Sequence, residues 1–257
     1  MEFFVIAITA FLAAILTFFS GFGLGTILTP VFMIFFPVEA AIALTGIVHF
    51  SNNIFKIALV GRGADKSTVL RFGIPAVIAA FAGAWILLNI PDASPLFSYE
   101  MAGRIWEVYP VKFLISILLI CFALMDLIPF FTRLQFGKDK LPLGGILSGF
   151  FGGLSGNQGA LRAAFLIKAG LSKEAYIGTA VVVSTMVDFT RLGVYSTRFK
   201  ESGLGENIPI VICGTLAAIA GAFLGNKLLK KITLHSLQVI VAIMLILLSV
   251  ALGMGLI

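Results

Sequence analysis

Four polar residues share one face of an otherwise apolar segment of the chain. They are spaced i, i+3, i+4 and i+7, which brings them to the same side of a helix, and they are His49, Asn52, Asn53 and Lys56. A cation inside a bilayer costs about 2.5–3.5 kcal/mol, so an intramembrane lysine normally faces a partner or water. We therefore predict that Lys56 helps to bind an anion. The alternative is a side chain that extends to the membrane surface, since the next basic residue, Arg62, follows closely.

A later apolar segment carries a matching polar stripe. Its members, at i, i+4 and i+7, are Ser184, Asp188 and Arg191. Two such stripes that face each other would line a polar cavity with a cation from each side. We predict that Arg191 also attracts the anion, and the alternative is that Asp188 and Arg191 neutralise each other at i, i+3.

Glycine clusters precede both stripes and predict interrupted helices, because a glycine costs about 1 kcal/mol in a helix interior. The first cluster contains Gly21, Gly23 and Gly25, and the second contains Gly156, Asn157, Gln158 and Gly159, with Arg162 just beyond. An interrupted helix exposes backbone N–H groups and the positive end of its dipole, which favour an anion. Amide and guanidinium donors suit oxyanion oxygens. The alternative is that these glycines only allow close helix packing.

Other kinds of chemistry find little support in the sequence. No cluster of Cys, His and carboxylate residues has the spacing of a metal site, and no nucleotide-binding or nucleophile motif occurs, so we expect no cofactor, no metal and no ATP-driven pumping. Protons remain a candidate coupling ion. Asp126 could carry one, although local pairing with Arg133 is the simpler interpretation.

The composition predicts an all-α polytopic membrane protein. Hydrophobic residues make up 60% of the 257 residues, against roughly 45–50% in soluble domains. Apolar runs of about 20 residues span a bilayer as helices, and they do not alternate as barrel strands would. Eight apolar segments are expected, near 3–36, 38–60, 73–89, 111–131, 142–168, 174–197, 207–226 and 232–256.

The net charge of +6 follows the connections and does not indicate nucleic acid. Residues 61–72 and 132–141 each hold three basic residues against one acidic, and 226–231 holds three basic residues alone. We expect these loops to be cytoplasmic. The connection 90–110 holds one basic residue against three acidic, and 198–207 is balanced, so both should lie outside. With the loops on these sides, segments 3–36 and 142–168 must each begin and end on the same side of the membrane. We therefore expect both segments to be broken or re-entrant.

An internal repeat appears when the chain is shifted by 135 residues. The shift aligns Ser20-Gly21 with Ser155-Gly156 and Lys56 with Arg191. We therefore predict two repeats, residues 1–131 and 142–257, joined by a cytoplasmic linker, 132–141. Each would hold a broken or re-entrant helical element and three transmembrane helices. Three full crossings per half give the halves opposite orientations, the plan of many secondary transporters.

Two glycine motifs carry a family resemblance. The first is the run Gly21-Phe-Gly-Leu-Gly-Thr-Ile-Leu-Thr-Pro30, followed by Ala40, and the second lies near 149–159. In these motifs, and in length and number of apolar segments, the chain resembles the TauE/SafE family of sulfite and organosulfur-anion exporters. The resemblance implies that Gly21, Gly23, Gly25 and Pro30 form the first family motif and that Gly156 and Gly159 belong to the second. It also implies export of a sulfur oxyanion or a related small organic anion.

These observations favour a secondary transporter of the bacterial-type inner membrane, which binds a small anion at mid-membrane and switches access by rocking its halves. An anion channel on the same scaffold is one alternative. A membrane-embedded enzyme or sulfur-handling partner is another, because His49 beside Asn52 and Asn53 could transfer protons. The expected partners are the substrate anion and the lipid bilayer. Homo-oligomerisation is left open.

Overall fold

The computed structural model describes residues 1–18, 23–90, 94–128, 136–167, 169–198, 207–228 and 234–256. Gly21 lies outside these ranges, as do 132–135 of the expected linker and 229–231 of the expected basic loop. The first half contains α1 (Glu2–Thr17), α2 (Leu24–Met33), α3 (Val38–Val60), α4 (Lys66–Thr68), α5 (Ile74–Asn89) and α6 (Pro110–Leu127). The second contains α8 (Leu141–Ser155), α9 (Gly159–Leu166), α10 (Lys173–Tyr195), α11 (Ile208–Leu228) and α12 (Leu234–Gly253).

Four helical stretches are long and apolar enough to cross a membrane: Ala40–Gly63, Lys66–Asn89, Lys173–Tyr195 and Ile208–Lys227. The second of these runs from α4 through a short π-helical turn, Val69–Gly73, into α5. Asp65 caps its start, because its carboxylate accepts a 2.7 Å hydrogen bond from the Thr68 amide. Hydrogen bonding from the Thr68 side chain and amide holds the pKa of Asp65 below its usual range.

Both segments that the glycine clusters were expected to interrupt are divided into two helices. In the first, α1 ends at Thr17 and α2 begins at Leu24 after Gly23, which is extended. In the second, α8 ends at Ser155 and α9 begins at Gly159. Between them Gly156 adopts φ +78°, a left-handed conformation that glycine tolerates best. The chain therefore turns at Gly156, and in the first half separate helices lie on either side of the glycine cluster.

A β-hairpin departs from the expected all-α fold. Strands β1 (Phe97–Met101) and β2 (Arg104–Val108) pair antiparallel in the connection between α5 and α6. Aromatic and β-branched residues favour the strands. Ala102 and Gly103 both have positive φ, as the tight turn of a two-residue hairpin requires. The structure is therefore mostly helical, and the hairpin in the connection 90–110 was not expected because only segments long enough to span a bilayer were considered.

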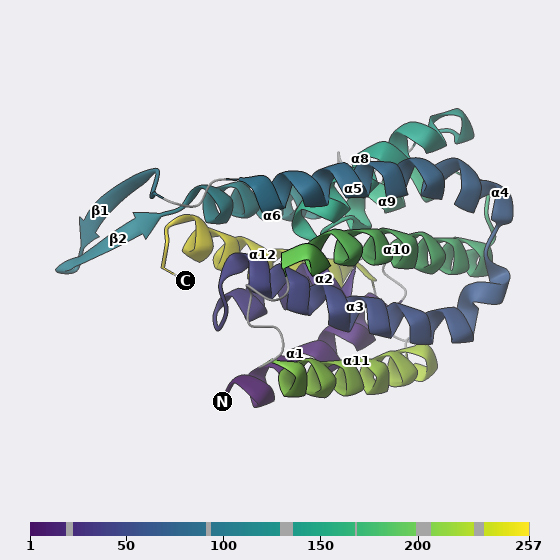
Figure 1. Cartoon of the computed structure of the whole chain (residues 1–257). Helices are drawn as coiled ribbons and strands as arrows, with labels where there is room; N and C mark the ends of the chain where they lie inside the picture. Colours follow the sequence, from purple (N-terminus) through teal and green to yellow (C-terminus); the bar gives the residue numbers. More distant parts are fainter. Residues whose placement is uncertain are drawn as a thin grey trace.

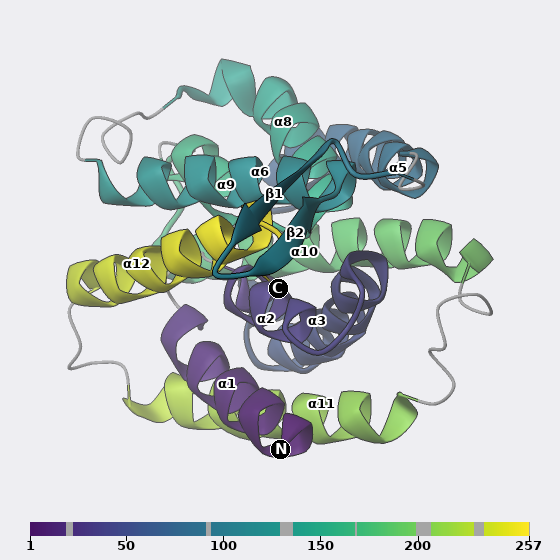
Figure 2. The same cartoon turned by 90° about the vertical axis from the view of Figure 1, so that its left-hand side faces the viewer.

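The two longest helices, α3 and α10, cross as an antiparallel pair in the middle of the bundle. The end of α3 meets the start of α10, where Gly178 packs against the Val60 carbonyl. Farther along the pair, the Arg191 guanidinium lies beside Gly46. Figure 2 shows α2 and α3 in the middle, with α1 and α11 below them and α5, α6, α8 and α9 above. The polar stripes of both helices are thereby enclosed by protein.

Glycine seams join each broken element to a helix of the other half. The α8 glycines lie against successive backbone carbonyls of the stretch that leads into α5; the pairs are Gly145 with Phe72, Gly149 with Ala76 and Gly153 with Ala80. On the opposite side of the bundle, α11 packs on α1 in the same way; the pairs are Gly221 with Phe11 and Gly225 with Ile15. Small residues permit this close approach of helix backbones in membranes. In both seams the residue numbers of the two partners increase in the same direction, so the packed helices run parallel.

The described parts of the three basic connections gather at one end of the molecule (Figure 1). These are 61–72 before and within the start of the α4–α5 stretch, 136–141 at the start of α8, and 226–228 at the end of α11. The hairpin and both chain termini lie at the opposite end. Large apolar side chains cover much of the sides between these ends, among them Ile78, Phe189, Leu216 and Leu247, each more than 60% exposed.

Candidate functional site

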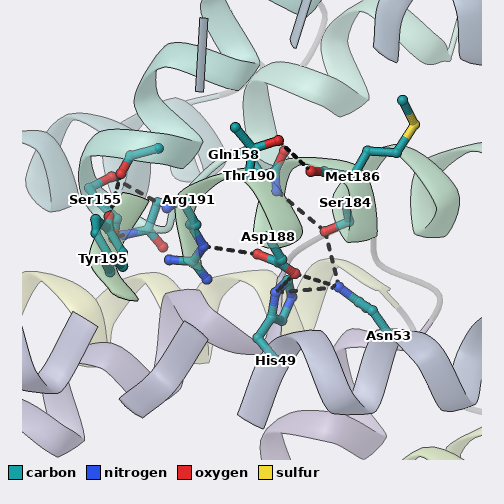
Figure 3. A network of polar contacts seen from close by, with 12 residues as sticks. His49, Asn53, Ser155, Gln158, Ser184, Met186, Asp188, Thr190, Arg191 and Tyr195 are labelled. Atoms are coloured by element: carbon teal, nitrogen blue, oxygen red, sulfur yellow. Dashed lines mark hydrogen bonds and ion pairs between the residues drawn. The ribbon is translucent and has the colours of Figure 1, made fainter. Parts of the chain in front are cut away.

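The central helices bring the two polar stripes together at their midpoints. His49 is the middle residue of α3 and Ser184 the middle residue of α10. The His49 Nδ1 atom lies 2.6 Å from Asp188 Oδ2, and both side chains are buried (Figure 3). A nitrogen this close to a carboxylate oxygen donates its hydrogen, so Asp188 fixes the orientation of the imidazole ring.

Amide side chains extend this contact into a polar network. Asn53 Nδ2 donates to Asp188 Oδ2 at 3.0 Å and lies 3.2 Å from Ser184 Oγ. From the second break, Gln158 Nε2 reaches the same hydroxyl at 3.3 Å. The network thus joins α3, α10 and the turn between α8 and α9 (Figure 3).

Arg191 continues the network away from the midpoint. Its Nε donates to Asp188 Oδ1 at 3.0 Å, so the i, i+3 pairing that the sequence left open is formed. The guanidinium is fully buried and approaches the glycine turn, because a Cβ on Gly156 would lie 2.7 Å from Nη1. Among the described residues, neither Nη atom has a hydrogen-bond partner.

The two breaks meet beside this network. A Cβ on Gly25, in the first turn of α2, would lie 3.4 Å from the Gly156 carbonyl oxygen. A Cβ on Gly23 would lie 3.2 Å from His49 Nε2. The histidine therefore presents one nitrogen to Asp188 and the other to the start of α2. The first turn of a helix has unpaired N–H groups and a positive dipole end, which together attract anions.

A small cavity lies on the other side of His49, toward the end with the basic connections. Its volume is about 30 Å³, room for about two water molecules. Its polar lining comes from both stripes and both broken elements: Thr17, Gly23, His49, Asn53, Lys56, Arg162, Tyr176 and Ser184. None of the described lining residues is a carboxylate. The cavity is therefore lined by two basic side chains, Lys56 and Arg162, and by no described carboxylate.

Lys56 does not extend to the membrane surface. The residue is only 4% exposed, and its Nζ lies 5.2 Å from the centre of the Phe18 ring, a cation–π contact. It makes no hydrogen bond or ion pair within the described ranges. Arg162 is also 4% exposed and lies close enough for its charge to act on Lys56.

Several expected site residues lie outside the cavity lining. Asp188, Arg191, Gly25, Gly156 and Gln158 surround the network or the crossing of the breaks. Asn157 donates its side-chain amide to the Ser155 carbonyl, and Gly159 begins α9. Asn52 is fully buried, and neither of its side-chain polar atoms has a partner within the described ranges. Of Asp126, only the backbone is described.

Two tyrosines belong to the site although the stripe on α10 did not include them. Tyr176 lines the cavity eight residues before Ser184, and Tyr195 donates its hydroxyl hydrogen to the Gly153 carbonyl, close to the end of α8. Both fall on the same helical face as Ser184 and Asp188, because steps of three and four residues connect them. Extending the stripe to tyrosines at both ends would have found them.

No group of three His, Cys, Asp or Glu side chains suited to a metal ion occurs in the described ranges. Comparison with known families identifies one that covers the whole arrangement. The family model described as sulfite exporter TauE/SafE matches residues 6–252, from α1 to α12. Among curated proteins, none matches the chain.

Proposed function

Because the chain belongs to the sulfite exporter TauE/SafE family, we propose that it carries a small sulfur-containing anion, such as sulfite or an organosulfonate, as an exporter-like secondary transporter. The family is one of membrane transporters and not of enzymes, so the polar network at mid-membrane serves transport and not catalysis. The proposed substrate site is the cavity between His49, Lys56 and Arg162.

The observation that carries this proposal is the pair of buried cations that face one cavity. Lys56 and Arg162 repel each other, and no described carboxylate lines the space between them. Basic residues inside a membrane are costly and commonly mark substrate sites, so two of them at one polar cavity support an anion as its occupant. Ser184, Asn53 and the start of α2 add uncharged donors around the same space.

The proposed mechanism is alternating access between two inverted repeats, residues 1–131 and 142–257. Reciprocal packing supports it, because α8 lies along α5 and α1 lies along α11, each broken element on a helix of the other half. The antiparallel crossing of α3 and α10 also fits inverted halves. Lys56 and Arg191 then occupy equivalent positions, one toward each membrane face, and each would meet the anion in turn.

The end with the basic connections is proposed to be cytoplasmic, in a bacterial-type inner membrane, because Lys and Arg concentrate in cytoplasmic loops. The described basic residues of 61–72, 136–141 and 226–228 support this orientation. The cavity near Lys56 would then lie nearer the cytoplasm, and the Asp188–Arg191 pair nearer the outside.

Flux of labelled sulfite into proteoliposomes tests the proposal. If the protein is a carrier, uptake of the label should saturate. Uptake should also be faster when the vesicles contain unlabelled sulfite, because the binding site then returns to the outside with an anion bound. Organosulfonates should compete with the label, whereas an uncharged osmolyte at the same concentration should not change the uptake. Flux that rises linearly with concentration and ignores the internal anion would favour the channel. Empty liposomes give the background, and equal flux in both preparations would refute transport by this chain.

A further inference from the structure

The contacts of His49 point to a role beyond positioning. Resting on the proposed function, we infer that His49 carries a proton with each substrate anion, held between the Asp188 carboxylate and the anion cavity. The established family assignment concerns the anion and says nothing of a coupling ion. Of Asp126, the proton carrier that the sequence suggested, only the backbone is described.

The two nitrogens of His49 have different surroundings. Nδ1 lies 2.6 Å from Asp188 Oδ2 and keeps its hydrogen in both protonation states. Nε2 faces the start of α2 at Gly23 and has no hydrogen-bond partner in the described part of the chain. Only Nε2 can therefore take up a proton. The step is the addition of one water-derived proton to the Nε2 lone pair, which converts the imidazole to imidazolium.

The charges around the pair link this proton to the anion. From α3, Lys56 faces the pair; from α10, Arg191, Tyr176 and Tyr195 face it; from α9, Arg162 does. The described residues that approach the network from the two breaks are uncharged, Gly23 and Gln158 among them. Lys56 and Arg191 thus oppose the imidazolium, and among the described charged residues Asp188 favours it. A bound anion would supply the missing negative charge.

Linkage makes the effect reciprocal. If the anion favours protonated His49, then protonated His49 binds the anion more tightly by the same factor. Proton and anion then occupy the site together and cross in the same direction. Asp188 keeps the pair anchored to α10, while Arg191 holds its other carboxylate oxygen at 3.0 Å. The proton site and the anion site consequently belong to one network.

Proton uptake during anion binding tests the inference. Purified protein in weakly buffered detergent solution with a pH-indicator dye is titrated with methanesulfonate, which remains fully ionised near neutral pH. We expect wild-type protein to take up a proton as it binds the anion, and His49→Gln to bind more weakly and take up none. The control is His235→Gln, the other histidine of the chain, which should behave like wild type.

Each outcome decides between the inference and the proposed function. Anion binding by wild type without proton uptake, or uptake that persists in His49→Gln, would overturn the inference and leave the transport proposal standing. Absence of any binding or flux in wild type would overturn the transport proposal itself. If His49→Gln binds too weakly to measure, Asp188→Asn decides: lower uptake supports the inference, because the imidazolium has lost its carboxylate, and unchanged uptake overturns it.

Discussion

Replacing Lys56 with methionine should make the empty protein more stable and should weaken its binding of the anion. The ammonium is buried beside Arg162 without a carboxylate in the cavity lining, so it raises the free energy of the empty protein. Two like charges separated by about 4–8 Å repel by roughly 2–4 kcal/mol at an effective dielectric constant near 20. Methionine keeps the unbranched side chain against Phe18 and removes the charge. The empty variant should therefore be more stable, by about 1–3 kcal/mol.

The same substitution should weaken anion binding. A hydrogen bond between an ammonium and an oxyanion contributes about 1.5–3 kcal/mol, so the dissociation constant should rise roughly 10- to 100-fold. Thermal unfolding in detergent, followed by intrinsic fluorescence, measures both effects in one experiment. We expect a higher melting temperature for Lys56→Met without ligand and a smaller shift on addition of sulfite. Lys66→Met provides the control, because Lys66 is exposed at the same end of the molecule.

A less stable Lys56→Met protein that keeps the full sulfite-induced shift would refute this reasoning. That result would mean that the cation–π contact with Phe18 outweighs the repulsion, and that the anion binds elsewhere. If Lys56 serves anion binding, the substitution should raise the stability of the empty protein. If Lys56 is structural, the substitution should lower it.

Two glycine substitutions test the scaffold around the site, and each has a matched control. Gly149→Ala should lower the stability by about 1–3 kcal/mol, since its Cβ would meet the Ala76 backbone, whereas Gly193→Ala has open space and should not destabilise; chemical denaturation in detergent compares them. Gly156→Ala should reduce both stability and flux, because φ is +78° there and the Cβ would lie 2.7 Å from Arg191 Nη1. Gly103→Ala, at φ +73° without neighbours within 4 Å, should show the backbone cost of about 1 kcal/mol alone and leave flux intact.

The sequence predicted the helical positions of the site because helix periodicity converts spacing directly into a shared face. His49, Asn53 and Lys56 line the cavity together, as their spacing indicated. The glycine clusters located both helix breaks for a similar local reason, because glycine weakens helices wherever it gathers. The hairpin at 97–108 was missed, since a strand pair of ten residues does not appear in a search for segments that span a bilayer.

The partners of the cations depended on tertiary packing, which the sequence pattern does not contain. Spacing paired Lys56 with Arg191 by analogy between the repeats, yet the second cation at the cavity is Arg162 from the broken element. The position of α9 relative to α3 follows from how α8 lies along α5, and that seam is a long-range contact. From the sequence, Asp188 could either pair with Arg191 or face the cavity. In the structure it pairs with Arg191 on its own helix, and the packing of α3 on α10 also brings it to His49.

A single difference between the halves accounts for the asymmetry of the site. The shift of 135 residues that aligns Lys56 with Arg191 also aligns Asn53 with Asp188, so a carboxylate stands three residues before one cation and an amide before the other. Arg191 is accordingly paired within its own helix, whereas Lys56 lines the cavity with no described carboxylate beside it. Because a paired cation attracts an anion less strongly, the described residues favour the proposed anion site near the basic end. For the anion to bind Arg191, the ion pair between Asp188 and that guanidinium must weaken. Protonation of His49, whose Nδ1 lies 2.6 Å from Asp188 Oδ2, gives the carboxylate a second cation that competes with Arg191.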